Sequence, residues 1–318
     1  MVYLMVGIAL LCLTVKGYCG KKTSVAVRNM GDSFLFNLLR MVFCVAIGAV
    51  MVLIEGSARS LLIDGKMIAI CLLSGVANAA FLAGWLLAIQ KNSMVSVDVG
   101  LTLGSLLPAI LCLALFGHAI SIPKMIGFGF IIAATVILAG HSKKTVGGGF
   151  LGALLLVLAA LGDGLSGFAQ QLYNQYYTAA GDRFSGVYYP KSVFLFYTYV
   201  FAAAALFIVY CIYWMWDVKK NGGAKGIAEK KEKRFHIPLP IVIHIAVMAV
   251  CLFAASYFQT VATGDYGMDP QVLYPIIKGG CLITVNFVAM IFFNEKMTLR
   301  SVMGSLVALV GIVIMNVL

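Results

Sequence analysis

The sequence predicts an all-α integral membrane protein in which ten transmembrane helices form two inverted five-helix repeats. Three observations support this fold class. The 318-residue chain has a mean hydropathy of +1.00, with 62% hydrophobic and 11% charged residues, whereas soluble domains carry roughly 25% charged residues. Its apolar residues fall into runs long enough to cross a bilayer. Two stretches, 116–127 and 293–304, match at six of twelve positions at an offset of 177, with two identical and four similar residues, which indicates an internal duplication.

The apolar runs are predicted to be helices, because a helix crosses the hydrocarbon core with about 20 apolar residues and satisfies its own backbone in lipid. No alternation typical of a closed barrel is present. The longest polar stretch, 217–236, is too short for a soluble domain, so the chain is a single membrane domain. The ten predicted spans are 2–19, 34–55, 67–89, 94–117, 122–140, 149–172, 192–216, 238–262, 270–293 and 300–318.

These spans divide into a first repeat, 1–144, and a second repeat, 145–318. Five helices per repeat is an odd number, so the second copy enters the membrane from the opposite side and the repeats are inverted. Lys and Arg residues number 15 in one set of loops and 5 in the opposite set with the termini. The positive-inside rule therefore predicts both termini outside and the basic loop 217–237 in the cytoplasm.

The formal net charge of +11 does not indicate nucleic-acid binding, because seven of the 23 basic residues lie in the loop 217–237. Beside a membrane segment, such a cluster is a topology signal, with contact to anionic lipids as a further prediction. The eight cysteines lie in or at the ends of apolar segments without a CxxC spacing, so neither a metal site nor a cofactor is expected. No Lys or Arg precedes the first apolar run, which we expect to be retained as a helix rather than cleaved.

Several motifs resemble the drug/metabolite transporter superfamily in its ten-helix bacterial form with two EamA-like repeats. They are Leu39-Arg40 in the second span, the segment 274–280 in the ninth, and Phe293-x-Glu295-x-x-Thr298 leading into glycines of the tenth. The resemblance covers essentially the whole chain. It implies alternating access around a central cavity, with substrates that range over amino acids, sugars, nucleotide derivatives, drugs and lipid-linked sugars. One departure is His118, which stands in the first repeat where the second has Glu295.

Ionisable residues at membrane depth are functional candidates, because an unpaired charge there costs from about 2.5 kcal/mol upward. Lys278 lies deep in the ninth span, with Tyr274 one turn before it on the same face. Three interpretations of Lys278 are open: a substrate-binding cation, a structural ion pair with a buried carboxylate, and snorkelling. Asp98 and Thr102 form a polar stripe on the fourth span, and we expect Asp98 to interact with Lys278. For Asp98, a role at the helix N-terminus near water is the alternative.

Two further charges are candidates for coupling or for structure. Arg40 follows Asn37 on the second span, so it lines a cavity mouth or, as the favoured interpretation, binds a neighbouring helix. Asp163 lies between two glycines in the sixth span. A broken helix there would turn the carboxylate to a cavity as a coupling site, whereas a tight glycine-rich crossing would give it a structural role.

Aromatic and amide side chains complete the predicted substrate site, because such groups suit a partly apolar ligand that also forms hydrogen bonds. They are Trp85 and Asn78 on the third span and Tyr257 and Gln259 on the eighth. Contacts between helices are the alternative role for each of them.

A carrier is the predicted function, since the four histidines are scattered and no HExxH, GxSxG, P-loop or paired-carboxylate motif is present. An integral-membrane enzyme, a channel and a receptor are the other classes. Within the carriers, export of a small metabolite or drug-like solute across the cell membrane is the first expectation. Exchange of phosphorylated or nucleotide-linked sugars comes second and flipping of lipid-linked sugars third. The expected partners are a small-molecule substrate and the bilayer, with the protein a monomer or a homodimer.

Overall fold

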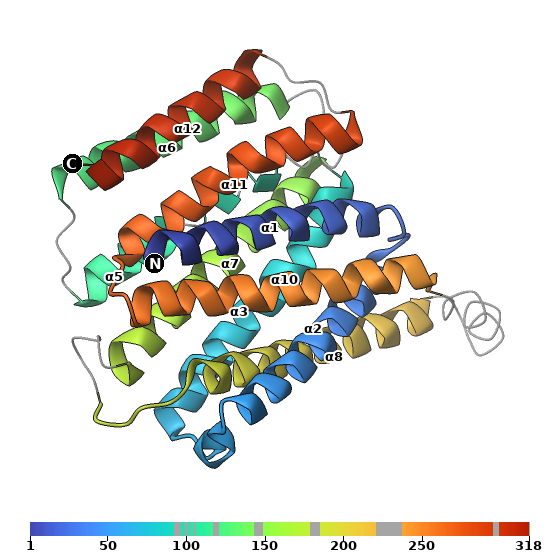
Figure 1. The fold of residues 1–318 in the computed structure, drawn as a ribbon. Coiled ribbons are helices and arrows are strands. Elements are labelled where there is room, and N and C mark those ends of the chain that lie inside the picture. The colour runs from blue at the N-terminus through green and yellow to red at the C-terminus, as the bar shows by residue number, and fades with distance from the viewer. Residues whose placement is uncertain are drawn as a thin grey trace.

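The protein is a bundle of long helices, shown in Figure 1, in which the described residues contain no strand. The structure is a computed structural model, and it describes residues 1–91, 97–98, 101–102, 104, 106–116, 121–142, 149–178, 185–220, 237–294 and 299–317. The helices are α1 (Val2–Ser24), α2 (Met30–Ile54), the 3-10 helix η1 (Ser57–Leu61), α3 (Gly65–Lys91), α5 (Leu106–Phe116), α6 (Ile122–Ser142), α7 (Gly149–Tyr177), α8 (Lys191–Lys220), α10 (Leu239–Gly264), α11 (Pro270–Phe293) and α12 (Leu299–Val317).

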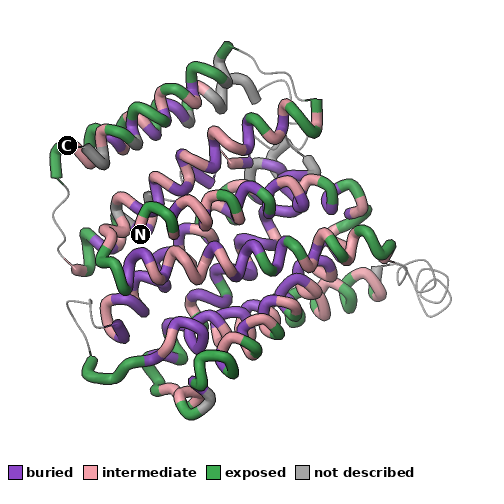
Figure 2. The backbone as a smooth tube through the Cα atoms, viewed as in Figure 1, coloured by how far each residue is buried: buried purple, intermediate pink, exposed green. Residues whose placement is uncertain are grey.

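The helices have the length and surface of membrane spans. Among the described residues, seven helices are long and apolar enough to cross a bilayer. Their outward faces carry large apolar side chains such as Leu53, Ile208 and Ile291, which are 70%, 58% and 63% exposed. Figure 2 shows that buried residues gather along the middle of the bundle, whereas the outer faces are exposed. Soluble proteins rarely expose apolar surface on this scale, so the protein is a multi-pass membrane protein.

The predicted spans lie at the positions of the observed helices, but several of the helices are longer than the spans. The ninth span matches α11 at both ends, whereas α1 continues five residues past the predicted end of the first span. Helices project beyond the hydrocarbon core, and the sequence rule registers only their apolar part. In the fourth span, residues 97–98, 101–102 and 104 are helical before α5 begins. The basic loop from 221 to 236, His118 and Glu295 lie outside the described residues.

Local chemistry fixes both ends of α2. At its start, the Asn29 side chain accepts a hydrogen bond of 2.9 Å from the Asp32 backbone nitrogen, which caps the helix. Past its end, Gly56 adopts a left-handed conformation with φ of 63°, which a glycine reaches without steric cost. The chain therefore reverses at Glu55 and returns through η1 into α3.

The helices pack in a regular pattern of neighbours. α3 packs against α7 and α8, while α1 packs against α10 and α11. α2 lies between α8 and α10, α5 contacts α7 and α11, and α6 pairs with α12 at the side of the bundle (Figure 1). α7 and α10 thus contribute to the centre of the bundle, where the site described below is found.

Glycines bring α3 and α7 into direct backbone contact. A Cβ atom on Gly162 would meet the Phe81 nitrogen and lie 2.6 Å from the Ala77 carbonyl oxygen, and one on Gly84 would lie 2.5 Å from the Leu155 carbonyl oxygen. α7 continues unbroken through this region. Of the two alternatives for the segment around Asp163, a broken helix and a closely packed one, the structure has the closely packed helix with a glycine crossing.

Both chain termini lie at the same end of the bundle, on the left of Figure 1. At this end α2 finishes beside Glu55, α8 begins at Lys191 and α10 finishes at Gly264. We refer to it as the Glu55 end.

Candidate functional site: a charged cavity in the bundle

Two adjoining cavities lie inside the bundle. The first has about 50 Å³ of space for water and the second about 30 Å³, and both are lined by Leu13, Lys16 and Lys278. One water needs about 10–15 Å³ on this measure, so each cavity holds a few waters. The other residues that line the first cavity are Asn78, Phe81, Pro108, Asp163, Gly164, Ser166, Gly167, Gln170, Leu252, Ala255, Ser256, Gln259 and Tyr274. Those of the second are Gly17, Trp85, Asp98, Leu101, Cys281 and Val285.

An ion pair joins α7 to α11 at the cavity wall. The Lys278 ammonium lies 2.5 Å from Asp163 Oδ2, and the two side chains are 14% and 17% exposed. Asp163 is the fifteenth of the 29 residues of α7, so the pair lies near the middle of that helix. Of the interpretations open for Lys278, the structure has the ion pair with a carboxylate. The expected partner Asp98 is wrong: α7, not the fourth span, presents the carboxylate in contact.

Asp98 nevertheless faces the same space. It lines the second cavity, and its Oδ2 atom is buried without a hydrogen-bond partner. Thr102, one turn later, is buried and donates a 2.8 Å hydrogen bond to the Asp98 carbonyl oxygen. Thr102 is not among the residues that line either cavity. Ser105, the third residue of the predicted stripe, lies outside the described residues.

Trp85 forms one wall of the second cavity and is supported from behind by Arg40. The Arg40 guanidinium carbon lies 5.2 Å from the Trp85 ring centroid, a cation–π distance. Arg40 is fully buried and donates a 2.7 Å hydrogen bond to Asn37 Oδ1, while Asn37 donates to the Leu82 carbonyl oxygen. Arg40 does not line the cavities. Its contacts agree with the structural interpretation, in which it holds α2 to α3 and fixes Trp85.

Replacing Arg40 with lysine is expected to lower the stability by about 1–3 kcal/mol, because lysine lacks the planar fork that reaches Asn37 and lies over the indole. Thermal unfolding measures this loss. In a protein whose exposed Trp214 and Trp216 are changed to phenylalanine, Trp85 is the only indole, and its fluorescence should shift to longer wavelength. Arg59→Lys, at an exposed arginine of η1, is the matched control; equal effects of the two variants would contradict the supporting role.

A ladder of polar side chains on α7 lines the first cavity and joins α3, α10 and α11. Asn78 donates to Ser166 Oγ at 2.7 Å, and the Gln170 amide donates to the Ser256 carbonyl oxygen at 3.0 Å. Tyr274 is buried with its hydroxyl 2.8 Å from Gln170 Oε1. The predicted residues Asn78 and Tyr274 thus belong to the site, and each is also held by contacts between helices.

The two site residues predicted on α10, Gln259 and Tyr257, lie at different places in the structure. Gln259 lines the first cavity, whereas the Tyr257 hydroxyl donates a 3.1 Å hydrogen bond to Glu55 Oε1 at the bundle end. Residues two apart on a helix point about 200° apart, so both could not face one cavity. The prediction of Tyr257 as a cavity residue is wrong.

Lys16 is the charged cavity residue that the sequence interpretation missed. It lines both cavities and is 6% exposed. In the predicted span 2–19 it stood in the last turn, where a lysine is ordinarily assigned to the interface. α1 continues to Ser24, which places Lys16 inside the bundle. The available signal is the neighbouring Gly17, since small residues in membrane helices are typical of positions that face other helices.

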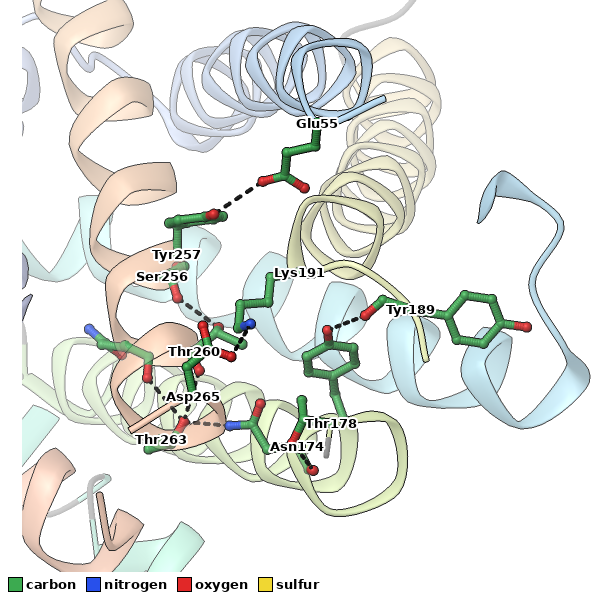
Figure 3. Close-up of polar contacts among 12 residues, drawn as sticks. Glu55, Asn174, Thr178, Tyr189, Lys191, Ser256, Tyr257, Thr260, Thr263 and Asp265 are labelled. Carbon is green, nitrogen blue, oxygen red and sulfur yellow. Dashed lines mark hydrogen bonds and ion pairs between the residues drawn. The ribbon is translucent and has the colours of Figure 1, made fainter. Parts of the chain in front are cut away.

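Polar contacts close the Glu55 end of the bundle, as Figure 3 shows. Lys191 pairs with Asp265 Oδ1 at 2.6 Å, and Glu55 accepts a hydrogen bond from Tyr257. Ser192, which the figure does not show, also donates to Glu55. Between this end and the first cavity, α7 is bound to α10 by Gln170 to Thr260 and, one turn later, by Asn174 to Thr263.

No family model matches the chain, and no curated protein matches it. Solved structures do match. One, described only as the crystal structure of a protein, aligns with a TM-score of 0.69 at 13% sequence identity, over 99% of this chain and 96% of that chain. At this identity the likeness shows a shared fold over the full length of both chains.

Proposed function

We propose that the protein is a secondary carrier that moves a small metabolite or drug-like solute across the cell membrane by alternating access. The observation that carries this proposal is the Lys278–Asp163 ion pair at a water-sized cavity, deep inside a bundle with an apolar exterior. Intramembrane charges that face a cavity mark substrate or ion pathways. Drug-sized ligand sites have about 300–1,000 Å³, so this cavity would have to widen to take such a solute.

The pattern of helix neighbours supports ten helices in two inverted repeats, 1–144 and 145–318. When each helix of the first half is exchanged for its equivalent in the second, the pair α3–α7 becomes α10–α1. The pair α5–α7 likewise becomes α11–α1, and α3–α8 becomes α10–α2. The pairs α2–α8 and α6–α12 map onto themselves. Such an exchange pattern is what a pseudo-twofold axis produces, and it agrees with the resemblance to the drug/metabolite transporter superfamily.

The distribution of basic residues supports an orientation in which the Glu55 end faces outward. The termini lie at this end (Figure 1), whereas α8 ends at Lys220 and α10 begins at Leu239 at the opposite end, on either side of the basic sequence. In that orientation the contacts in Figure 3 form an outer gate, and the described state is closed on the outside. Export from the cytoplasm is our first choice of direction.

Exchange of phosphorylated or nucleotide-linked sugars is the second candidate. The observation that favours it is the excess of cations at the site, where Lys16, Lys278 and nearby Arg40 face two carboxylates. The amide groups of Asn78 and Gln259 would suit sugar hydroxyls.

Cysteine labelling from each side of the membrane tests alternating access without a known substrate. In a background whose eight cysteines are replaced, Ser166→Cys and Gln259→Cys present thiols to the first cavity. In sealed vesicles, an impermeant maleimide is expected to reach them only from the side opposite the Glu55 end. Adding Lys191→Ala and Asp265→Ala removes the gate ion pair, and labelling from the Glu55 side should then appear while labelling from the other side falls.

Ser185→Cys, an exposed position at the Glu55 end, is the control and should react from that side in both backgrounds. Simultaneous labelling of the cavity positions from both sides would identify a channel instead. Absence of labelling from either side in both backgrounds would also contradict a carrier.

A further inference from the structure

We infer that Lys16 is the substrate-binding cation of the cavity and that the substrate presents a carboxylate or a comparable single anionic group to it. This inference rests on the proposed carrier function, because it names the chemistry of the solute that the same cavity takes.

Lys16 is buried, faces the cavity and forms no ion pair within the part of the chain that the structure describes. Its side chain is 6% exposed and lines both cavities. Among the described residues, no carboxylate lies within ion-pair distance of its ammonium, whereas Lys278 is paired with Asp163. A buried ammonium without a partner is costly in a membrane interior, so the site is completed by whatever supplies the counter-charge.

Two aromatic rings hold the ammonium in place. The Lys16 Nζ atom lies 4.9 Å from the Phe81 ring centroid and 5.2 Å from the Trp85 ring centroid. These contacts offset part of the cost of burial. The ammonium has three donors, and none of them is bonded to a residue that the structure describes. The same Trp85 ring receives the Arg40 guanidinium, so two cations share one indole, and Coulomb repulsion between them favours an anion nearby.

The balance of charge at the site selects a single anionic group. Lys278 and Asp163 cancel each other, and Asp98 offers one negative charge against Lys16 and Arg40. The remaining charge is one positive. Asp98 keeps one carboxylate oxygen without a hydrogen-bond partner, which also gives a solute with a hydrogen-bond donor or an ammonium group a place opposite Lys16.

Four probes with one aryl group and different charges test the inference on the wild-type protein. They are phenylacetate, phenylacetamide, phenethylamine and phenylalanine, and the measurement is the rise in melting temperature in detergent, with Trp85 fluorescence as the second signal after Trp214 and Trp216 are changed to phenylalanine. Phenylacetate is expected to stabilise the protein, whereas the neutral amide and the cationic amine are not. Stabilisation by phenylalanine as well would support the role of Asp98 opposite Lys16.

Variants of Lys16 identify the cation. Lys16→Met is expected to weaken phenylacetate binding by about 10- to 100-fold, since a hydrogen bond to a charged group contributes about 1.5–3 kcal/mol, and Lys16→Arg should retain it. Lys22→Met is the matched control, because Lys22 also lies over two aromatic rings, Tyr18 and Phe293, on the same helix but lines neither cavity.

Equal stabilisation by the amide or the amine, or unchanged binding in Lys16→Met, would overturn the inference. The comparison of probes uses the wild-type chain, so it decides even where a variant does not fold. These binding outcomes do not depend on the cysteine-labelling experiment. Labelling of the cavity positions from both sides would contradict the carrier but would leave the charge preference of the cavity unchanged.

Discussion

Lys278→Met is expected to destabilise the protein by about 3–5 kcal/mol, more than the double variant Lys278→Met with Asp163→Leu. The single change leaves the Asp163 carboxylate in the bundle interior without its partner at 2.5 Å. Breaking a buried ion pair on one side costs this much, whereas replacing both partners with apolar groups of similar size is often close to neutral. Thermal unfolding in detergent measures the order of stability, in which wild type and double variant should lie close together.

The Lys124–Asp269 ion pair supplies the control. It joins α6 to the start of α11, and its side chains are 21% and 37% exposed. Lys124→Met is expected to cost about 1 kcal/mol or less, because water screens exposed pairs. A double variant no more stable than Lys278→Met would show that Asp163 does not need the lysine. The double variant should also fold without moving substrate, which separates the stability of the pair from its role at the cavity.

Gly162→Leu is expected to prevent assembly of the bundle or to lower its stability by about 3 kcal/mol or more. The first side-chain atom would meet the backbone of α3 at Phe81 and Ala77. Overpacking commonly costs about 1–3 kcal/mol when side chains can move aside, and backbone atoms of a paired helix have less freedom to do so. The yield of folded protein after size-exclusion chromatography and the melting temperature measure the effect.

Gly129→Leu tests whether the effect belongs to the contact rather than to glycine as such. A Cβ atom at Gly129 meets nothing within 4 Å, so leucine there should be neutral or slightly stabilising, in line with its better helix propensity. Equal loss in the two variants would contradict the close crossing of α3 and α7.

The sequence is sufficient for the membrane class and for several polar residues of the cavity, and the reasons are physical. A polar side chain within an apolar run has few places to lie except the interior, which is why Asn78, Asp163 and Tyr274 were found. Which residues touch depends on helix rotation and on pairing between distant helices, and neither is written in local periodicity. Asp98 was therefore assigned to Lys278 in place of Asp163.

The errors at Lys16 and Tyr257 have separate causes. Lys16 stood at the end of an apolar run, and the limit of that run was mistaken for the limit of the helix. Tyr257 is predicted as a cavity residue because its side chain is aromatic. The angle of about 200° between it and Gln259 around the helix turns the two side chains to different faces. The structural role favoured for Arg40 agrees with its contacts. Its indole partner, Trp85, lies 45 positions away in the sequence, and the packing of α2 on α3 brings the two together.

The glycine contact between α3 and α7 joins helices from opposite halves of the chain. α1 and α10 are joined in the same way, through small and apolar residues such as Ala9, Ala255 and Ala262. The close contacts of α3 and α1 are therefore made with α7 and α10, which belong to the other half of the chain. Without that half, the small and apolar faces of these helices would stay uncovered. In the proposed carrier, the units that move against each other would be pairs of helices drawn from both halves of the chain, and we expect neither half to fold without the other.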